Sequence, residues 1–372
     1  MTSTLFRGGS IITWADEEVD AVVVEDGRVV AHEEQPCDEV VELDGGLLIP
    51  GFVDSHTHLV FGGERAAEFE ARMAGRPYEA GGIRTTVEAT RAATTDELLR
   101  YAQGLAAEAL RSGTTTLEVK SGYGLTVEDE VRLLQVAQAI TPHTTYLGAH
   151  VPDRDYPGDY TALAAGEMLA ACAPYATAAD AFCEEGAFDV DQCREVLTAA
   201  KARGLDLHVH GNQLQPGGGA QLAAELEALS CDHCTFVDED DAAALYDAAV
   251  TAVLVPAAEF CTFSSYAPAR MLLDAGVTVA LATDCNPGTS FTTSMPFVIA
   301  LAVRELDMTP VEALFAATQG GADALGQDDI GHLRVGARAD LVVVDAGSPT
   351  HFAYRPGVDL VTQVWQGGRR VR

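Results

Sequence analysis

Two histidines, His56 and His58, stand two residues apart in the run from Pro50 to Leu59. If this run is a strand, both imidazoles point to the same face, because side chains alternate along a strand. Neutral imidazole is the commonest metal ligand in proteins, and zinc and iron both accept it. A pair of this kind can also be two unrelated polar residues at the end of a strand. The hypothesis of a metal site therefore requires further ligands elsewhere in the chain.

Further candidate ligands and catalytic groups stand at the ends of other apolar runs. The side chains that close these strand-like runs are His150, His210, His233 and Asp284. The strand ends of a (β/α)8 barrel share one mouth, so residues far apart in the sequence converge there. The positions therefore predict a single site. His208 lies two residues before His210, deeper on the same face, and is expected to be structural.

The middle of the chain, residues 50–334, alternates such apolar runs with amphipathic helices. Thr94 with Glu97 and Thr309 with Glu312 have the spacing of capping boxes, which predicts two helix starts. Roughly six to eight strand–helix units of this kind predict an α/β fold with a (β/α)8 TIM-like barrel. At 372 residues the chain is long enough for such a barrel and a smaller appendage.

The two ends of the chain differ from the middle. Residues 1–49 and 335–372 are rich in short strand-like runs and hairpin signals, such as Asp26-Gly27 between two valine-rich runs. Two all-β ends that flank an α/β middle predict that both termini meet in one small composite β domain. The barrel would then span residues 50–334.

The charge of the chain is extreme. Asp and Glu number 56 against 23 Lys and Arg, a net charge of −33, and only Lys120 and Lys201 are lysines. Such a surface repels nucleic acid and anionic membranes, so we expect a small-molecule substrate and neither of those partners. Self-repulsion is tolerable where the Debye length falls to about 3 Å, at molar salt. We therefore expect a halophilic, salt-rich host. Full structure and activity at very low salt would contradict this.

Three features of the sequence bear on where in the cell the protein is expected. The chain begins without the charged start and apolar run of a signal peptide. No apolar stretch reaches the about 18 residues that a membrane helix requires. The eight cysteines are irregularly spaced, which argues against a disulfide framework. We therefore expect a cytoplasmic protein.

The chain resembles the amidohydrolase superfamily of metal-dependent hydrolases over nearly its entire length. The stretches that carry the resemblance include His56–Arg65, Glu118–Leu125 and Thr283–Gly288. The His-x-His marks the superfamily. Lys-Ser-Gly-Tyr-Gly-Leu together with Thr-Asp-x-Asn-Pro-Gly narrows the match to members that open a five-membered cyclic amide. The resemblance implies the amidohydrolase type of barrel with a small β-sandwich domain, and a homodimer.

By the same resemblance, one divalent metal ion is held by four side chains: His56, His58, His210 and Asp284. Three imidazoles and a carboxylate suit Zn²⁺ or Fe²⁺ and leave a position open for water, whose pKa a divalent cation can lower to about 7. Two-metal relatives need a lysine at a strand end as a bridging ligand. Lys120 is followed by the loop-like Ser-Gly-Tyr-Gly, so we expect no strand end there and a single ion.

The resemblance further implies the substrate. This is 4-imidazolone-5-propanoate, whose ring is opened by water to give N-formimidoyl-L-glutamate in histidine degradation. The residues implied in substrate or product contacts are Arg65, Tyr123, His150, Gln213, Asn286, Gly288 and Thr289. In a chain so poor in cations, an arginine near the barrel mouth can bind the propionate by charge-assisted hydrogen bonds.

For the reaction we expect activated water to attack the ring carbonyl while Asp284 accepts a proton and passes it on. His233 would orient the water or the developing oxyanion, and His150 would hold the ring. Some relatives carry a carboxylate three residues after the third histidine, where this chain has Gln213. An amide cannot act as a base, so Gln213 is expected only to hydrogen-bond the ring.

Two other functions fit parts of the pattern. Another mononuclear amidohydrolase, such as a deaminase of a nucleobase-like ring, would use the same metal chemistry. Its substrate would not require the cation of Arg65. A catalytically silent amidohydrolase-like scaffold would have no need to keep all four ligands.

Overall fold

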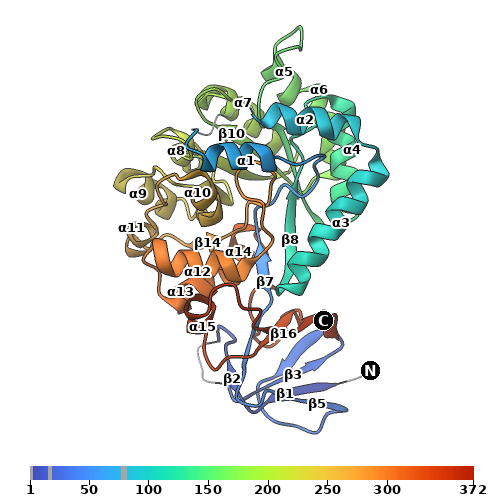
Figure 1. Cartoon of the computed structure of the whole chain (residues 1–372), viewed down its shortest axis with the longest axis vertical. Helices are drawn as coiled ribbons and strands as arrows, with labels where there is room; N and C mark the ends of the chain where they lie inside the picture. Colours follow the sequence, from blue (N-terminus) through green and yellow to red (C-terminus); the bar gives the residue numbers. More distant parts are fainter. Residues whose placement is uncertain (1–2, 16–18, 77–81) are drawn as a thin grey trace.

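The computed structural model describes residues 3–15, 19–76 and 82–372. It has two parts, a barrel of parallel strands wrapped by helices and a smaller pair of sheets beneath it (Figure 1). Strands from both ends of the chain lie side by side in the smaller part. In the part of the chain that the structure describes, no helix is long and apolar enough to cross a membrane.

Eight parallel strands form the barrel sheet in sequence order, which confirms the predicted barrel. Their bounds are β7 Phe52–Asp54, β8 Thr114–Lys120, β9 His143–Ala149, β10 Ala178–Cys183, β11 Asp206–Gly211, β12 Ser230–His233, β13 Thr251–Leu254 and β14 Val279–Leu281. Nearly all of their residues are buried, as expected for parallel strands covered on both faces. The first and last strands meet just beyond their ends, where Thr57 forms a parallel bridge with Cys285.

Helices connect successive barrel strands and cover the outside of the barrel (Figure 1). Their bounds are α1 Ala66–Met73, α2 Ile83–Ala92, α3 Thr95–Arg111, α4 Val127–Gln138, α5 Tyr160–Ala165, α6 Glu167–Cys172, η2 Ala173–Tyr175, α7 Val190–Lys201, α8 Gly219–Glu225, α9 Glu239–Asp247, α10 Pro256–Thr262, α11 Ala269–Asp274, α12 Met295–Glu305, α13 Pro310–Ala316 and α14 Gln319–Ala324.

Both predicted capping boxes are present. The Thr94 hydroxyl accepts a hydrogen bond from the backbone N–H of Glu97, and the Glu97 carboxylate accepts one from the backbone N–H of Thr94. Thr309 and Glu312 start α13 in the same way, with Pro310 as its first residue. Each box satisfies backbone donors that have no partner within the first helical turn, so these starts are set locally.

The smaller part consists of two sheets, ordered β4-β3-β1-β5 and β17-β16-β15-β6-β2. The bounds are β1 Thr4–Arg7, β2 Ser10–Ile11, β3 Ala21–Glu25, β4 Arg28–Ala31, β5 Glu39–Glu42, β6 Leu47–Pro50, β15 Leu341–Val344, α15 Thr350–Tyr354, β16 Val361–Gln366 and β17 Arg369–Arg370. Phe6 of the first sheet meets Trp365 of the second edge-on, with ring centroids 5.1 Å apart, inside a core shared by both sheets. The predicted small β-sandwich built from both chain ends is therefore confirmed.

The borders between the two parts remain a proposal. We propose that the small domain comprises residues 1–49 and 335–372 and the barrel residues 50–334. In support, β6 ends at Pro50 in a sheet of the small part, and β7 begins at Phe52 in the barrel.

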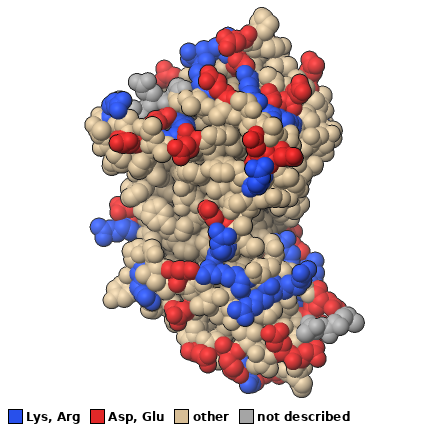
Figure 2. Space-filling model, turned by 45° about the vertical axis from the view of Figure 1, so that its right-hand side comes forward, with Lys and Arg blue, Asp and Glu red and all other residues tan. Residues whose placement is uncertain are grey.

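Acidic side chains are spread over the face shown in Figure 2, on the barrel as well as on the small sheets. Lys and Arg side chains on that face form a band over the lower half of the molecule and are scattered over the upper half. The acid excess is therefore not confined to one segment, in keeping with its even spread along the sequence.

Candidate active site

The first two candidate ligands lie in an extended segment that continues β7. Strand β7 ends at Asp54, two residues before His56. The segment stays paired with the other end of the barrel, because the backbone N–H of Asp284 donates to the carbonyl of His56 at 3.1 Å. Asp54 reinforces the closure by accepting hydrogen bonds from the backbone N–H (3.0 Å) and hydroxyl (2.6 Å) of Thr283. The barrel closure itself therefore places Asp284 beside His56.

Three candidate ligands and Asp284 converge from distant parts of the chain. His210 Nε2 lies 3.4 Å from His58 Nε2. Asp284 Oδ1 lies 3.6 Å from His56 Nε2 and 3.5 Å from His58 Nε2. Atoms that bind one tetrahedral ion at about 2.1 Å are about 3.4 Å apart, so this spacing fits a single ion.

Among the described residues, the compact groups that could hold an ion overlap at His56. One contains His56, His58 and Asp284, and another contains His56, His210 and His233. His56 Nε2 is buried and has no hydrogen-bond partner within the described part of the chain, as expected of an atom that faces an ion. Burial lowers the pKa of both His56 and His58, which keeps their imidazoles in the neutral form that binds metals.

Two carboxylates lie behind the imidazoles and orient them. His56 Nδ1 donates to Asp232 Oδ2 at 2.5 Å. His210 Nδ1 lies 2.8 Å from Asp180 Oδ2, and the His210 backbone N–H donates to Asp180 Oδ1. Such partners set which ring nitrogen carries the proton and so direct the other nitrogen to the metal. The sequence interpretation missed both carboxylates, although an aspartate within the buried run Ala178–Cys183 was a usable signal.

Lys120 corrects one expectation. We expected no strand to end at this lysine, yet β8 ends there, and its side chain is fully buried. Its ammonium contacts Asp180 at 2.9 Å, Glu118 at 3.2 Å and Asp232 at 3.6 Å. Burial acts to lower the Lys120 pKa, but these carboxylates outweigh it and raise the pKa. Because these carboxylates keep Lys120 protonated, its ammonium cannot act as a metal ligand. A single ion is therefore still expected, although the reason is the charge state of Lys120 and not the absence of a strand end.

Asp284 and His233 both have backbone conformations that side chains rarely adopt, with φ of 49° and 77°. Such conformations concentrate at functional sites, where the surrounding structure maintains them. Asp284 Oδ2 accepts a hydrogen bond from the Thr289 hydroxyl at 3.0 Å, and Asn286 donates to Thr289 at 2.7 Å. Burial raises the Asp284 pKa to about 7. His233 is buried, and its Nδ1 has no partner among the described residues.

The substrate-contact residues implied by the sequence, except Gly288, line one cavity together with three of the four candidate ligands, His58, His210 and Asp284. Its lining includes His58, Arg65, Tyr123, His150, His210, Gln213, His233, Asp284, Asn286 and Thr289. His150 Nδ1 donates to the carbonyl of Gly122 at 2.9 Å, which leaves Nε2 as a hydrogen-bond acceptor. His208 is held away from this cavity by a 2.8 Å contact with Ser230 Oγ, in keeping with the structural role expected for it.

Arg65 enters the cavity next to Gly288. A Cβ atom at position 288 would come within 2.2 Å of Arg65 Nη1, so a side chain there would force the guanidinium to shift. Arg65 also donates from Nε to Glu68 at 2.8 Å, and it is buried. The ion pair between Arg65 and Glu68, three residues apart, holds the Arg65 guanidinium in place through charge-assisted hydrogen bonds.

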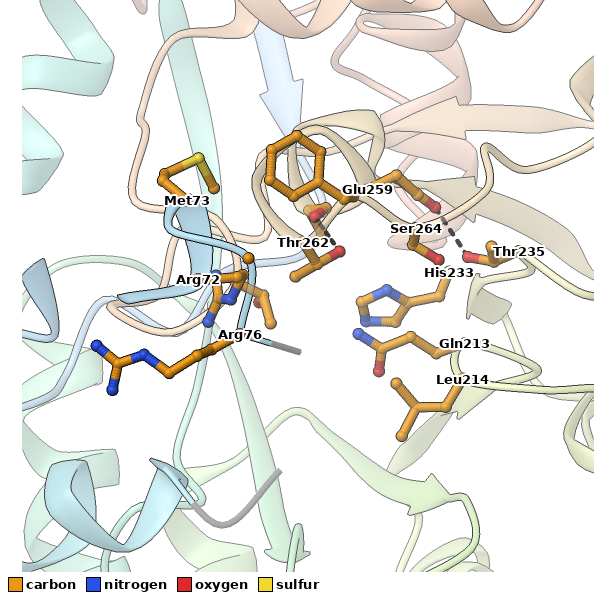
Figure 3. A pocket seen from close by; sticks show the side chains of 14 residues that line it. Arg72, Met73, Arg76, Gln213, Leu214, His233, Thr235, Glu259, Thr262 and Ser264 are labelled. Atoms are coloured by element: carbon orange, nitrogen blue, oxygen red, sulfur yellow. Dashed lines mark hydrogen bonds between the residues drawn. The ribbon is translucent and has the colours of Figure 1, made fainter. Parts of the chain in front are cut away.

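A second, larger cavity of about 520 Å³ adjoins the first (Figure 3). The two share Gln213, Leu214, His233 and Thr289 as lining residues. Figure 3 shows His233, Gln213 and Glu259 on one side of this cavity and Arg72 and Arg76 on the other. The sequence interpretation did not identify this cavity.

Comparison with known proteins identifies the family of the chain. The model of the amidohydrolase family matches residues 47–371. An imidazolonepropionase of Streptomyces avermitilis is 58% identical over 361 residues, covering 95% of this chain and 87% of the relative. An imidazolonepropionase of Mycolicibacterium smegmatis is 59% identical over 358 residues, covering 94% of this chain and 90% of the relative.

Solved structures of the same fold are more distant in sequence. A zinc-bound adenosine deaminase of Xanthomonas campestris has a TM-score of 0.72 at 22% identity and covers 99% of this chain and 92% of that one. A guanine deaminase of C. acetobutylicum has a TM-score of 0.73 at 16% identity and covers both chains fully. At these identities the likeness concerns the fold alone.

Proposed function

Because the chain belongs to the amidohydrolase family and its relatives at 56–59% identity are imidazolonepropionases, we infer that it opens the ring of 4-imidazolone-5-propanoate by hydrolysis. The product is N-formimidoyl-L-glutamate, and the reaction belongs to histidine degradation. The structural observation that supports this function is that His56, His58, His210 and Asp284 converge next to the cavity that Arg65 lines. A nucleobase-type deaminase is not favoured, because its substrate lacks the propionate that Arg65 would bind.

We propose that His56, His58, His210 and Asp284 hold one divalent ion, Zn²⁺ or Fe²⁺. When bound, the ion activates water and polarises the ring carbonyl. The separations of 3.4–3.6 Å between ligand atoms support this assignment. The neutral state of buried His56 and His58 supports it as well.

Asp284 moves the proton in this proposal. It accepts a proton from the attacking water and delivers it to the ring nitrogen that leaves. The Thr289 hydroxyl holds Oδ2, so the carboxylate stays oriented with Oδ1 toward the histidines. His233, which lines both cavities, orients the water and the developing oxyanion. Gln213 carries no proton and only hydrogen-bonds the ring.

Arg65, Tyr123 and His150 bind the substrate in this proposal. The guanidinium of Arg65 donates charge-assisted hydrogen bonds to the propionate carboxylate. The ring of His150 stacks on that of His58 with centroids 5.4 Å apart, and its Nε2 accepts from the substrate ring. Tyr123 contacts both rings, with centroids 5.9 Å from that of His58 and 5.3 Å from that of His150, and lines the same cavity. Asn286 and Thr289 also line the cavity. Asn286 Oδ1 accepts hydrogen bonds from the backbone N–H groups of Gly288 and Thr289, and Gly288 leaves room for Arg65.

We further propose that the protein acts in the cytoplasm, as a homodimer, in salt-rich cells. Its substrate is an intermediate of amino-acid breakdown, which supports the first point. The net charge of −33 supports the last. Light scattering in molar salt measures the state of assembly, and a monomer there would contradict the dimer.

The function is tested by an assay of the purified protein in high salt, with metal content measured in parallel. We expect loss of the ultraviolet absorbance of imidazolone propionate and one divalent ion per chain. Removal of the ion with a chelator should reduce the rate to background, because the activated water is lost. Zn²⁺ or Fe²⁺ should restore it. A fully active protein without metal would contradict the metal assignment, and a fully loaded protein without turnover would contradict the function.

A further inference from the structure

Glu259 is the one acidic side chain among the described residues that line the larger cavity. It lies in α10, and its side chain is almost completely buried, with 4% of its surface exposed. The Thr235 hydroxyl donates to Oε1 at 2.8 Å (Figure 3). Oε2 is buried and has no hydrogen-bond partner within the described residues. A buried acceptor without a donor costs free energy, so this oxygen is suited to receive a donor from a ligand.

The larger cavity adjoins the place where the ring opens. Gln213 and His233, which the proposed function assigns to the ring and to the oxyanion, form part of the wall between the two cavities. The substrate cavity is small, about 60 Å³, against about 520 Å³ on the other side of that wall. A part of the product that is released next to Gln213 and His233 therefore has more room in the larger cavity than in the substrate cavity.

The chemistry of the reaction supplies such a group. This step rests on the proposed function. Hydrolysis breaks the bond between the ring carbonyl carbon and the adjacent ring nitrogen. The carbonyl carbon becomes a carboxylate, and the nitrogen becomes the end of a formimidoyl arm. That arm is an amidine, a strong base that is protonated at neutral pH and then carries several N–H donors.

We propose that the larger cavity is the subsite for the amidinium arm of the opened product, with Glu259 Oε2 as its acceptor and counter-ion. The arm binds by charge-assisted hydrogen bonds, which are the strong ones in proteins. On the opposite side of the cavity, Arg72 donates to Glu68 at 3.0 Å and Arg76 is exposed to solvent.

Binding of the arm requires only the transfer of one proton within the subsite. Burial raises the Glu259 pKa to about 8. When the ring opens, the arm is released as the neutral amidine, and protonated Glu259 transfers its proton to the amidine nitrogen, which leaves a carboxylate beside an amidinium. The net charge of the cavity does not change, and no carbon–nitrogen bond is made or broken in this step.

The experiment compares two ligands by calorimetry on the metal-loaded, full-length protein. N-formimidoyl-L-glutamate carries the amidinium, and N-formyl-L-glutamate has oxygen in place of that nitrogen. We expect the wild-type protein to bind the first about tenfold to a hundredfold more tightly, the range of a hydrogen bond to a charged group. Glu259→Gln should abolish this preference and leave the affinity for N-formyl-L-glutamate unchanged.

Thr262→Val is the matched control. Thr262 lines the same cavity, but its hydroxyl donates to the Ala258 carbonyl at 2.7 Å within α10. This variant should keep the wild-type preference. Glu259→Asp, which withdraws the carboxylate but keeps its charge, should weaken the preference and provides a second variant if Glu259→Gln does not fold.

Equal binding of the two ligands by the wild-type protein would overturn the subsite without any variant. A preference that survives in Glu259→Gln would also overturn it. Turnover of imidazolone propionate separates this outcome from the failure of the proposed function. A wild-type protein that opens the ring but shows no ligand preference refutes only the subsite, and one that does not open the ring refutes the function.

Discussion

Asp284→Asn is expected to reduce turnover at least about a thousandfold, within the range for removal of a group that carries protons in the transition state. Asparagine keeps an oxygen that can face the ion, but its amide cannot accept and release a proton. The measurement is kcat and KM in saturating metal, with the bound metal determined on the same sample. Saturating metal separates loss of the proton carrier from loss of the ion.

Gln213→Ala is the matched comparison for Asp284→Asn. Both side chains line the substrate cavity, but only Asp284 carries a proton in the proposed reaction. We expect Gln213→Ala mainly to raise KM, by about tenfold, the effect of one lost hydrogen bond. Comparable and mild losses in both variants would contradict the assignment of the proton path to Asp284.

Lys120→Met is expected to destabilise the protein and weaken its hold on the metal. The substitution leaves Asp180, Glu118 and Asp232 buried around an apolar side chain. Removing one partner of a buried ion pair costs about 3–5 kcal/mol of the free energy of unfolding. Two of these carboxylates orient His56 and His210, so metal affinity should fall about 10- to 100-fold. Denaturant unfolding of the metal-free protein and competition with a coloured chelator measure the two effects.

Lys201→Met provides the control, since Lys201 is the only other lysine in the chain. Its ammonium lies 3.2 Å from Glu227, and both side chains are largely exposed, at 49% and 78%. An exposed pair contributes about 0–1 kcal/mol, so stability and metal affinity should hardly change. If both lysine variants behaved alike, the buried ammonium would have no special role.

The barrel could be predicted because its signals are local. The capping boxes at Thr94 and Thr309 start α3 and α13 where the sequence places them, since a cap involves residues only three positions apart. The turn at Asp26-Gly27 likewise lies between paired strands β3 and β4. Both residues have positive φ, 51° and 77°, as such a two-residue turn requires.

The carboxylates behind the histidines could not be predicted in the same way. Asp232 stands next to His233 in the sequence, yet its partner is His56, 176 positions away. The sequence predicted no strand end at Lys120, because the loop-like Ser-Gly-Tyr-Gly follows it. In the structure β8 continues through Lys120, and its ammonium is stabilised by Glu118 of the same strand, Asp180 of β10 and Asp232 of β12.

By itself, the sequence determined the barrel, the small domain of the two chain ends, and the residue types at the strand ends, because periodicity, caps and turns depend on near neighbours. Only the tertiary structure decided which ring nitrogen meets which carboxylate, how the buried charges balance, and that Glu259 lines a cavity beside His233. These features depend on distances between residues on different strands and helices, which closure of the barrel sets and no local pattern encodes.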